Sequence, residues 1–71
     1  MMSQEEIIEI AIPQTVNFPF NLNPQVIYID VFEESEGKRI KHTVEFRERL
    51  VIEAVSGEAH REWEFSKFLD V

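Results

Sequence analysis

Two stretches of alternating apolar and polar residues, joined by a short turn, constrain this chain more than any other feature of its sequence. Residues 26–32 alternate and are rich in β-branched and aromatic side chains, and residues 38–47 alternate again after Ser35-Glu36-Gly37. A period of two places successive side chains on opposite faces of a strand, and a short glycine-containing turn joins antiparallel neighbours. The sequence therefore predicts a β-hairpin with its turn at residues 35–37.

The side chains of this hairpin favour one register, in which Glu33 lies opposite Lys38. One face is then largely aliphatic, with the predicted pairs Val31–Ile40, Ile29–His42 and Ile27–Val44. The other face carries the predicted pairs Asp30–Lys41, Phe32–Arg39 and Tyr28–Thr43. Opposite charges and an aromatic–cation pair directly across from each other stabilise such a ladder. A slip of one residue would lose both patterns.

A second hairpin is predicted around Ser56-Gly57, as a two-residue loop with glycine at a position that favours positive φ. Its register gives the pairs Leu50–Trp63 and Arg49–Glu64. The alternative is a helix over residues 44–55, because Phe46, Leu50 and Ala54 recur every four residues. We favour the strand, because the segment is rich in β-branched residues.

The N-terminal third is expected to contain a strand at residues 7–12, with Ile8, Ile10 and Ile12 facing inward and Pro13 ending it. Residues 1–6 are expected to be flexible. Residues 13–24 form an apolar extended loop in this prediction, because their large apolar residues recur at even spacing; these are Val16, Phe18, Phe20 and Leu22.

Taken together, these segments predict a mostly β fold, either all-β or α+β, in a single domain of residues 1–71. The expected architecture is a small antiparallel meander of four to five strands, as an open sheet or a partly closed barrel, with one short helix as an optional element. The chain has no cysteine, so disulfides and thiolate metal sites are excluded. A small core without such staples depends on good packing or on self-association.

The net charge of −7 belongs to the first half of the chain. Residues 1–37 contain seven acidic residues and no lysine or arginine, whereas residues 38–71 contain seven of each sign. This distribution disfavours direct binding of nucleic acid or of an anionic membrane, both of which need a clustered basic face. Residues 1–6 have no signal-peptide character, and no apolar run has the length of a membrane span. We therefore expect a cytoplasmic protein.

No pattern in the sequence indicates catalysis, so the chain is predicted not to be an enzyme. Its two glycines, Gly37 and Gly57, are both explained by turns, which leaves no phosphate-binding loop. His42 is interpreted as a histidine at the sheet margin, hydrogen-bonded to backbone or solvent, in preference to a general base or a metal ligand. The spacing around His60 does not supply the three or four converging ligands that a zinc site needs. We expect no catalytic residues, no cofactor, no metal and no small-molecule substrate.

One face of the first hairpin instead indicates a protein-binding surface. Tyr28 and Phe32 lie there with Val26, and if this face is uncovered they form an apolar strip edged by Asp30, Glu33 and Glu34. The alternative is that residues 18–22 or the C-terminal tail covers this face. We expect a small interaction or regulatory module that binds a protein partner or itself, through this strip or through a free sheet edge. One alternative is an acidic DNA mimic that occupies a basic groove. A third is an accessory subunit of a larger complex with no activity of its own.

Overall fold

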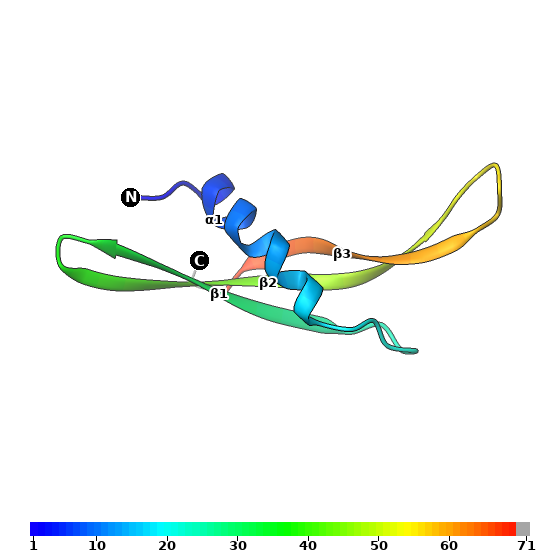
Figure 1. Cartoon of the computed structure of the whole chain (residues 1–71), viewed down its shortest axis with the longest axis horizontal. Helices are drawn as coiled ribbons and strands as arrows, with labels where there is room; N and C mark the ends of the chain where they lie inside the picture. Colours follow the sequence, from blue (N-terminus) through cyan, green and yellow to red (C-terminus); the bar gives the residue numbers. More distant parts are fainter. Residues whose placement is uncertain (70–71) are drawn as a thin grey trace.

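The computed structural model describes residues 1–69 and contains one open antiparallel sheet with a short helix across one of its faces (Figure 1). The elements are the helix α1 (Gln4–Ala11), the 3-10 helix η1 (Ile12–Asn17) and the strands β1 (Val26–Ser35), β2 (Lys38–Ile52) and β3 (Ala59–Phe68). The strand order is β1-β2-β3. The predicted mostly β fold is confirmed. The prediction of four to five strands is wrong, because residues 1–69 form three, and both outer strands keep a free edge.

The sheet gives the molecule an elongated shape. A strand rises about 3.4 Å per residue, so the 15 residues of β2 extend over roughly 50 Å. This length matches the longest dimension of the molecule, which measures 51 × 22 × 21 Å. The two hairpin loops lie at opposite ends of the long axis, and α1 covers only the part of the sheet between them (Figure 1).

The first hairpin has the predicted faces but a register shifted by two residues. Ser35 lies opposite Lys38, so the turn consists of Glu36 and Gly37 alone. Both residues have positive φ, 52° and 75°, as a type I′ turn requires. The predicted pairing of Glu33 with Lys38 assumed a longer turn. A shift of two residues leaves every side chain on its face, so Ile29 still lies on the aliphatic side, opposite Val44 in place of His42.

The second hairpin confirms strand over helix for residues 44–52, but its loop is longer than predicted. The chain between β2 and β3 spans residues 53–58 and is closed by a hydrogen bond from Glu53 N to Glu58 O of 2.8 Å. Gly57 has a φ of 73° within this wider loop. Trp63 consequently lies opposite Glu48, and Arg49 opposite Glu62. An irregularity beside Glu45/Phe46 shifts the register again near the end of β3.

The N-terminal segment is a helix, so the prediction of a strand at residues 7–12 is wrong. Ser3 accepts a hydrogen bond from Glu6 N, and the Glu6 carboxylate accepts one from Ser3 N. This capping box stabilises the first helical turn, which includes residues expected to be flexible. Ile7 and Ala11, one turn apart, are buried against the sheet. The predicted extended loop at residues 13–24 begins as η1 and is irregular only after Asn17.

The hydrophobic core lies between α1 and the middle of the sheet. Val44 and Phe46 of β2 are the most completely buried large side chains. The other buried apolar residues are Ile7, Ala11, Ile27, Ile29, Val31 and Phe68. Because this core occupies only the centre of a long sheet, the ends of both hairpins carry no core residues.

The turn of the first hairpin yields a prediction about stability. Glu36 adopts a left-handed conformation that asparagine tolerates better than glutamate. Glu36→Asn should therefore raise the free energy of unfolding by about 0.5–1 kcal/mol in urea denaturation. Glu36→Ala removes the same charge without the left-handed preference, so it should give no such gain. An equal gain from both substitutions would attribute the effect to charge.

Candidate functional site

The two faces of the sheet differ in what covers them. The inner face lies under α1 and the loop that follows it. The outer face consists, in β1, of residues whose side chains point away from the helix; these are Val26, Tyr28, Asp30, Phe32 and Glu34. Opposite them in β2 lie Arg47, Glu45, Thr43, Lys41 and Arg39. No helix of residues 1–69 packs against this outer face (Figure 1).

Four of the five residues predicted to bind a partner lie together on the outer face. Tyr28, Asp30, Phe32 and Glu34 alternate along β1 with buried residues. Glu33 has the other parity, so its side chain points to the inner face and is 8% exposed. The sequence showed this parity, because Glu33 is in phase with Val31. The prediction that Glu33 belongs with the outer acids is therefore wrong, because it relied on the adjacency of Glu34 and not on the position of Glu33 in the strand.

The apolar strip of the outer face is open to solvent. Val26 is 38% exposed, Tyr28 51% and Phe32 47%. The apolar segment after η1, which was one candidate to cover this strip, packs on the opposite face instead. Its Phe20 ring stacks on Trp63, with 5.3 Å between the ring centroids.

Two polar contacts fix the side chains around the strip. The Arg39 guanidinium lies 4.0 Å from the centre of the Phe32 ring, so the predicted aromatic–cation pair forms. It forms diagonally, because Lys41 is the residue directly opposite Phe32. Thr43 Oγ1 donates a 2.8 Å hydrogen bond to the Asp30 carboxylate. These contacts hold charged groups beside the aromatic rings and leave the rings accessible.

A buried carboxylate lies next to Tyr28 on the same face. Glu45, opposite Tyr28 in the ladder, is 3% exposed. A hydrogen bond from Ser66 lowers the pKa of Glu45 below its usual value, and the charges of Arg47 and Lys67 lower it further against the effect of burial. A further hydrogen bond from Tyr28 links this carboxylate to β1, so Glu45 connects all three strands on the outer face and stays ionised at neutral pH.

On one side of β1, the backbone N–H and C=O groups have no partner strand within residues 1–69. Glu48 N donates a 2.9 Å hydrogen bond to Gln25 O at the end of the β1–β2 ladder. Bonded and non-bonded pairs alternate in an antiparallel ladder, so the odd-numbered residues of β1 are bonded to β2. The even-numbered residues direct their N–H and C=O groups to the free edge of the sheet. No strand within residues 1–69 pairs with that edge.

On the inner face, Glu33 connects the N-terminus to the sheet. Its Oε1 lies 2.7 Å from His42 Nε2, and its Oε2 accepts a 3.1 Å hydrogen bond from Met2 N. The bond with His42 lowers the pKa of Glu33, and the bond from Met2 lowers it further. These contacts anchor the residues that precede α1, which is a structural role.

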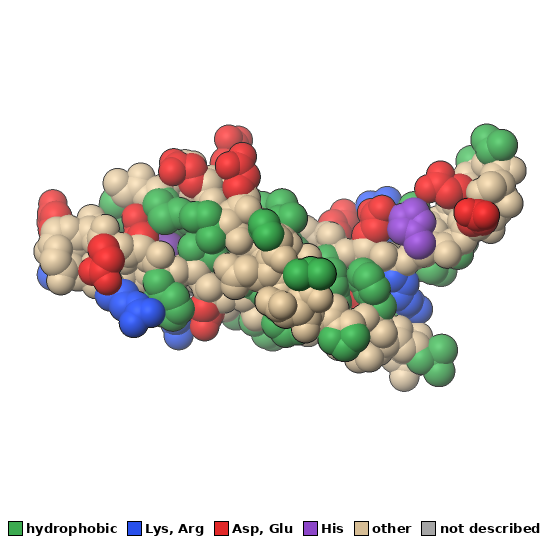
Figure 2. All heavy atoms as spheres, viewed as in Figure 1, with side chains coloured by type: hydrophobic (Ala, Val, Ile, Leu, Met, Phe, Trp, Pro, Cys, Tyr) green, Lys and Arg blue, Asp and Glu red, His purple; other side chains and the backbone are tan. Residues whose placement is uncertain are grey.

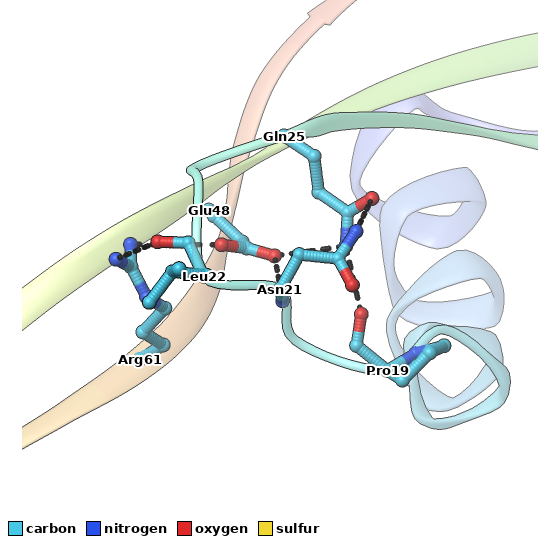
Figure 3. Close-up of polar contacts among 6 residues, drawn as sticks. All are labelled: Pro19, Asn21, Leu22, Gln25, Glu48 and Arg61. Carbon is cyan, nitrogen blue, oxygen red and sulfur yellow. Dashed lines mark hydrogen bonds and ion pairs between the residues drawn. The ribbon is translucent and has the colours of Figure 1, made fainter.

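A second buried carboxylate on the inner face, that of Glu48, holds the loop after η1 (Figure 3). The Glu48 side chain is fully buried, and its Oε1 accepts hydrogen bonds from Asn21 N (3.2 Å) and Gln25 Nε2 (2.9 Å). Its Oε2 lies 3.6 Å from Arg61 Nη1, and Arg61 Nη2 donates to Leu22 O at 3.2 Å. No sequence motif marks this cluster, because its members are up to 40 residues apart in the chain.

The surface on the helix side is acidic. Figure 2 shows Asp and Glu side chains gathered over α1 and towards the two hairpin ends. Within residues 1–69, no group of three or more His, Asp or Glu side chains is arranged to hold a metal ion. No helix in that part of the chain has the length and apolar character of a membrane span. The outer face of β1 is therefore the best-developed candidate site.

Comparisons of the chain with protein-family models, with curated proteins and with solved structures find no match.

The contacts of Glu33 predict a dependence of stability on pH. Because folding lowers the pKa of Glu33, its contribution to stability is complete above the ordinary value near 4.5 and is lost as the pH falls below it. Glu33→Gln should flatten the decline in urea stability between about pH 5 and pH 3. The neighbouring Glu34→Gln, on the exposed face, serves as control and should keep the wild-type slope. The same flattening in both variants would contradict this role for Glu33.

The contacts of Glu48 predict that one substitution releases the loop. Glu48→Ala removes the acceptor of the Asn21 and Gln25 hydrogen bonds and the ion-pair partner of Arg61, which should cost about 1–3 kcal/mol of stability. The chain has a single tryptophan, so loss of the Phe20–Trp63 stack should shift its fluorescence emission to longer wavelength. Glu62→Ala, at an exposed position on β3, should leave the emission unchanged. An unshifted spectrum in Glu48→Ala would mean that the loop stays docked without the carboxylate.

Proposed function

We propose that this protein is a small acidic interaction module that binds a protein partner through strand β1. One observation carries the proposal: the same alternate residues of β1 present exposed apolar side chains on the outer face and unpaired backbone groups at the sheet edge. A partner strand can pair with these backbone groups while its side chains contact the strip, which is the arrangement of β-strand addition.

The chemical character of the strip supports this reading. Tyrosine, phenylalanine and arginine are enriched in protein interfaces, and all three occur on this face: Arg39 lies over the Phe32 ring, and Tyr28 is on the same face of β1. The polar groups of Asp30 and Thr43 next to them resemble the polar rim that surrounds an apolar contact. Backbone pairing would supply affinity, and the alternating side chains would supply specificity.

DNA mimicry is less well supported. A mimic presents a continuous array of acids to a basic groove, as DNA presents its phosphates. On the outer face the acids of β1 lie beside four basic residues of β2; these are Arg39, Lys41, Arg47 and Arg49. The acids of α1 lie on the other side of the sheet. This interleaving of charge favours a protein partner over a nucleic-acid-binding target.

The test is a capture experiment from extracts of the native host, with bound proteins identified by mass spectrometry. The double variant Tyr28→Ser with Phe32→Ser should lose the proteins that the wild type captures, while its far-ultraviolet circular dichroism is unchanged. The matched control is Leu50→Ser with Ile52→Ser, which removes two apolar side chains of comparable exposure on β2, away from the strip. Equal capture by both double variants would reject the strip as the binding surface.

A further inference from the structure

We infer that the partner of the β1 edge is a second copy of this chain, joined by antiparallel pairing of the two β1 strands. This inference rests on the proposed function, because it assigns an occupant to the same edge. Three strands from each copy would form one continuous sheet of six. The two helices would lie on the same face of that sheet, because a two-fold axis perpendicular to a sheet keeps its faces aligned.

Of the two free edges, β1 has the more regular backbone. Natural proteins block edge pairing with bulges, prolines and lysines along the edge strand. β3 contains a register irregularity near its end and carries Lys67 there. The ten residues of β1 pair with β2 without interruption, and they contain no proline, lysine or arginine. The exposed edge of β1 is therefore long, regular and open to another strand.

The charge along β1 favours antiparallel pairing of like strands. Its first four residues, Val26 to Ile29, have no charged side chain, and all three acids lie among the six residues that follow; they are Asp30, Glu33 and Glu34. Antiparallel pairing can place the acids of each copy opposite uncharged residues of the other. Parallel pairing would place every acid beside its own copy, which is unfavourable.

The direction of the backbone groups restricts the register. Only even-numbered residues of β1 face the free edge, so bonded pairs must join even-numbered residues of the two copies. Pairing Tyr28 with Asp30 of the second copy satisfies this condition and places Val26 opposite Phe32. On the inner face it places Ile29 opposite Ile29 and Ile27 opposite Val31. A register displaced by two residues in one direction would instead set Asp30 against Asp30.

The exposed area of the single chain agrees with this assembly. A compact protein of 8.4 kDa exposes about 4,600 Å², whereas this chain exposes 5337 Å². The excess of roughly 700 Å² is close to the ~800 Å² that each partner buries in a stable interface. The radius of gyration of 14.7 Å likewise exceeds the ~11 Å expected for a compact chain of 71 residues. Pairing at β1 would leave each chain with one exposed sheet edge in place of two.

The first experiment removes one backbone donor from the edge. The N–H of Asp30 points away from β2, so Asp30→Pro deletes it without breaking the β1–β2 ladder. In sedimentation equilibrium of the full chain, Asp30→Pro should raise the dimer dissociation constant about tenfold or more, because the bond is lost on both sides of the two-fold axis. Asp30→Asn keeps the N–H and should associate as the wild type does. Circular dichroism verifies that both variants remain folded, and equal association of two folded variants would overturn the inference.

The second experiment tests the register and does not depend on the proline variant. Because the chain has no cysteine, single-cysteine variants form no background disulfides. A mixture of Tyr28→Cys and Asp30→Cys chains should form disulfide-linked dimers faster than either variant alone, since these positions face each other across the axis. Glu62→Cys mixed with Tyr28→Cys should crosslink slowly. Equal rates in all these mixtures would overturn the proposed register.

The outcomes separate this inference from the proposed function. A chain that remains monomeric at about 1 mM, where even weak complexes form, has no β1–β1 pairing. If such a monomer still captures a host protein through Tyr28 and Phe32, only the inference about a second copy fails. If it captures nothing that depends on these residues, both fail.

Discussion

Burial of Val44 and Phe46 in the central strand is the interaction on which the rest of this structure depends. These two side chains are almost completely removed from solvent, and they contact residues of both hairpins beneath α1. Replacing a buried phenylalanine by alanine typically costs about 3–5 kcal/mol, a large part of the total stability of a small domain. Without this central contact, neither neighbouring strand nor the helix has another core to pack against.

The same small core explains why the sheet has one covered face and one open face. A single short helix and the loop after it cover the inner face, where the buried carboxylates of Glu33 and Glu48 hold the N-terminal segments in place. Within residues 1–69 the outer face has no corresponding layer, so its aromatic residues and the edge of β1 remain exposed. The same sheet thus carries the core on one face and, on the other, the strip that we propose as an interaction surface.

Several elements were predictable because they depend on local pattern. The alternation around residues 26–47 gave the first hairpin and the faces of its side chains, and hence placed Tyr28 and Phe32 on one exposed face. The register was missed by two residues because the backbone conformation of Glu36 and Gly37 decides it, and side-chain alternation is identical for both registers. The helix was missed because four isoleucines outweighed the capping signal of Ser3 and Glu6.

The sequence by itself determined the two hairpins, the separation of the two faces of β1 and the position of the acidic half, because each follows from the spacing of neighbouring residues. Only the tertiary structure decided that Glu33 is buried against His42, that Glu48 holds the loop after η1, and that β1 is left at an edge. These features join residues distant in the chain, and their energies come from desolvation and from hydrogen bonds that exist only after the sheet has assembled.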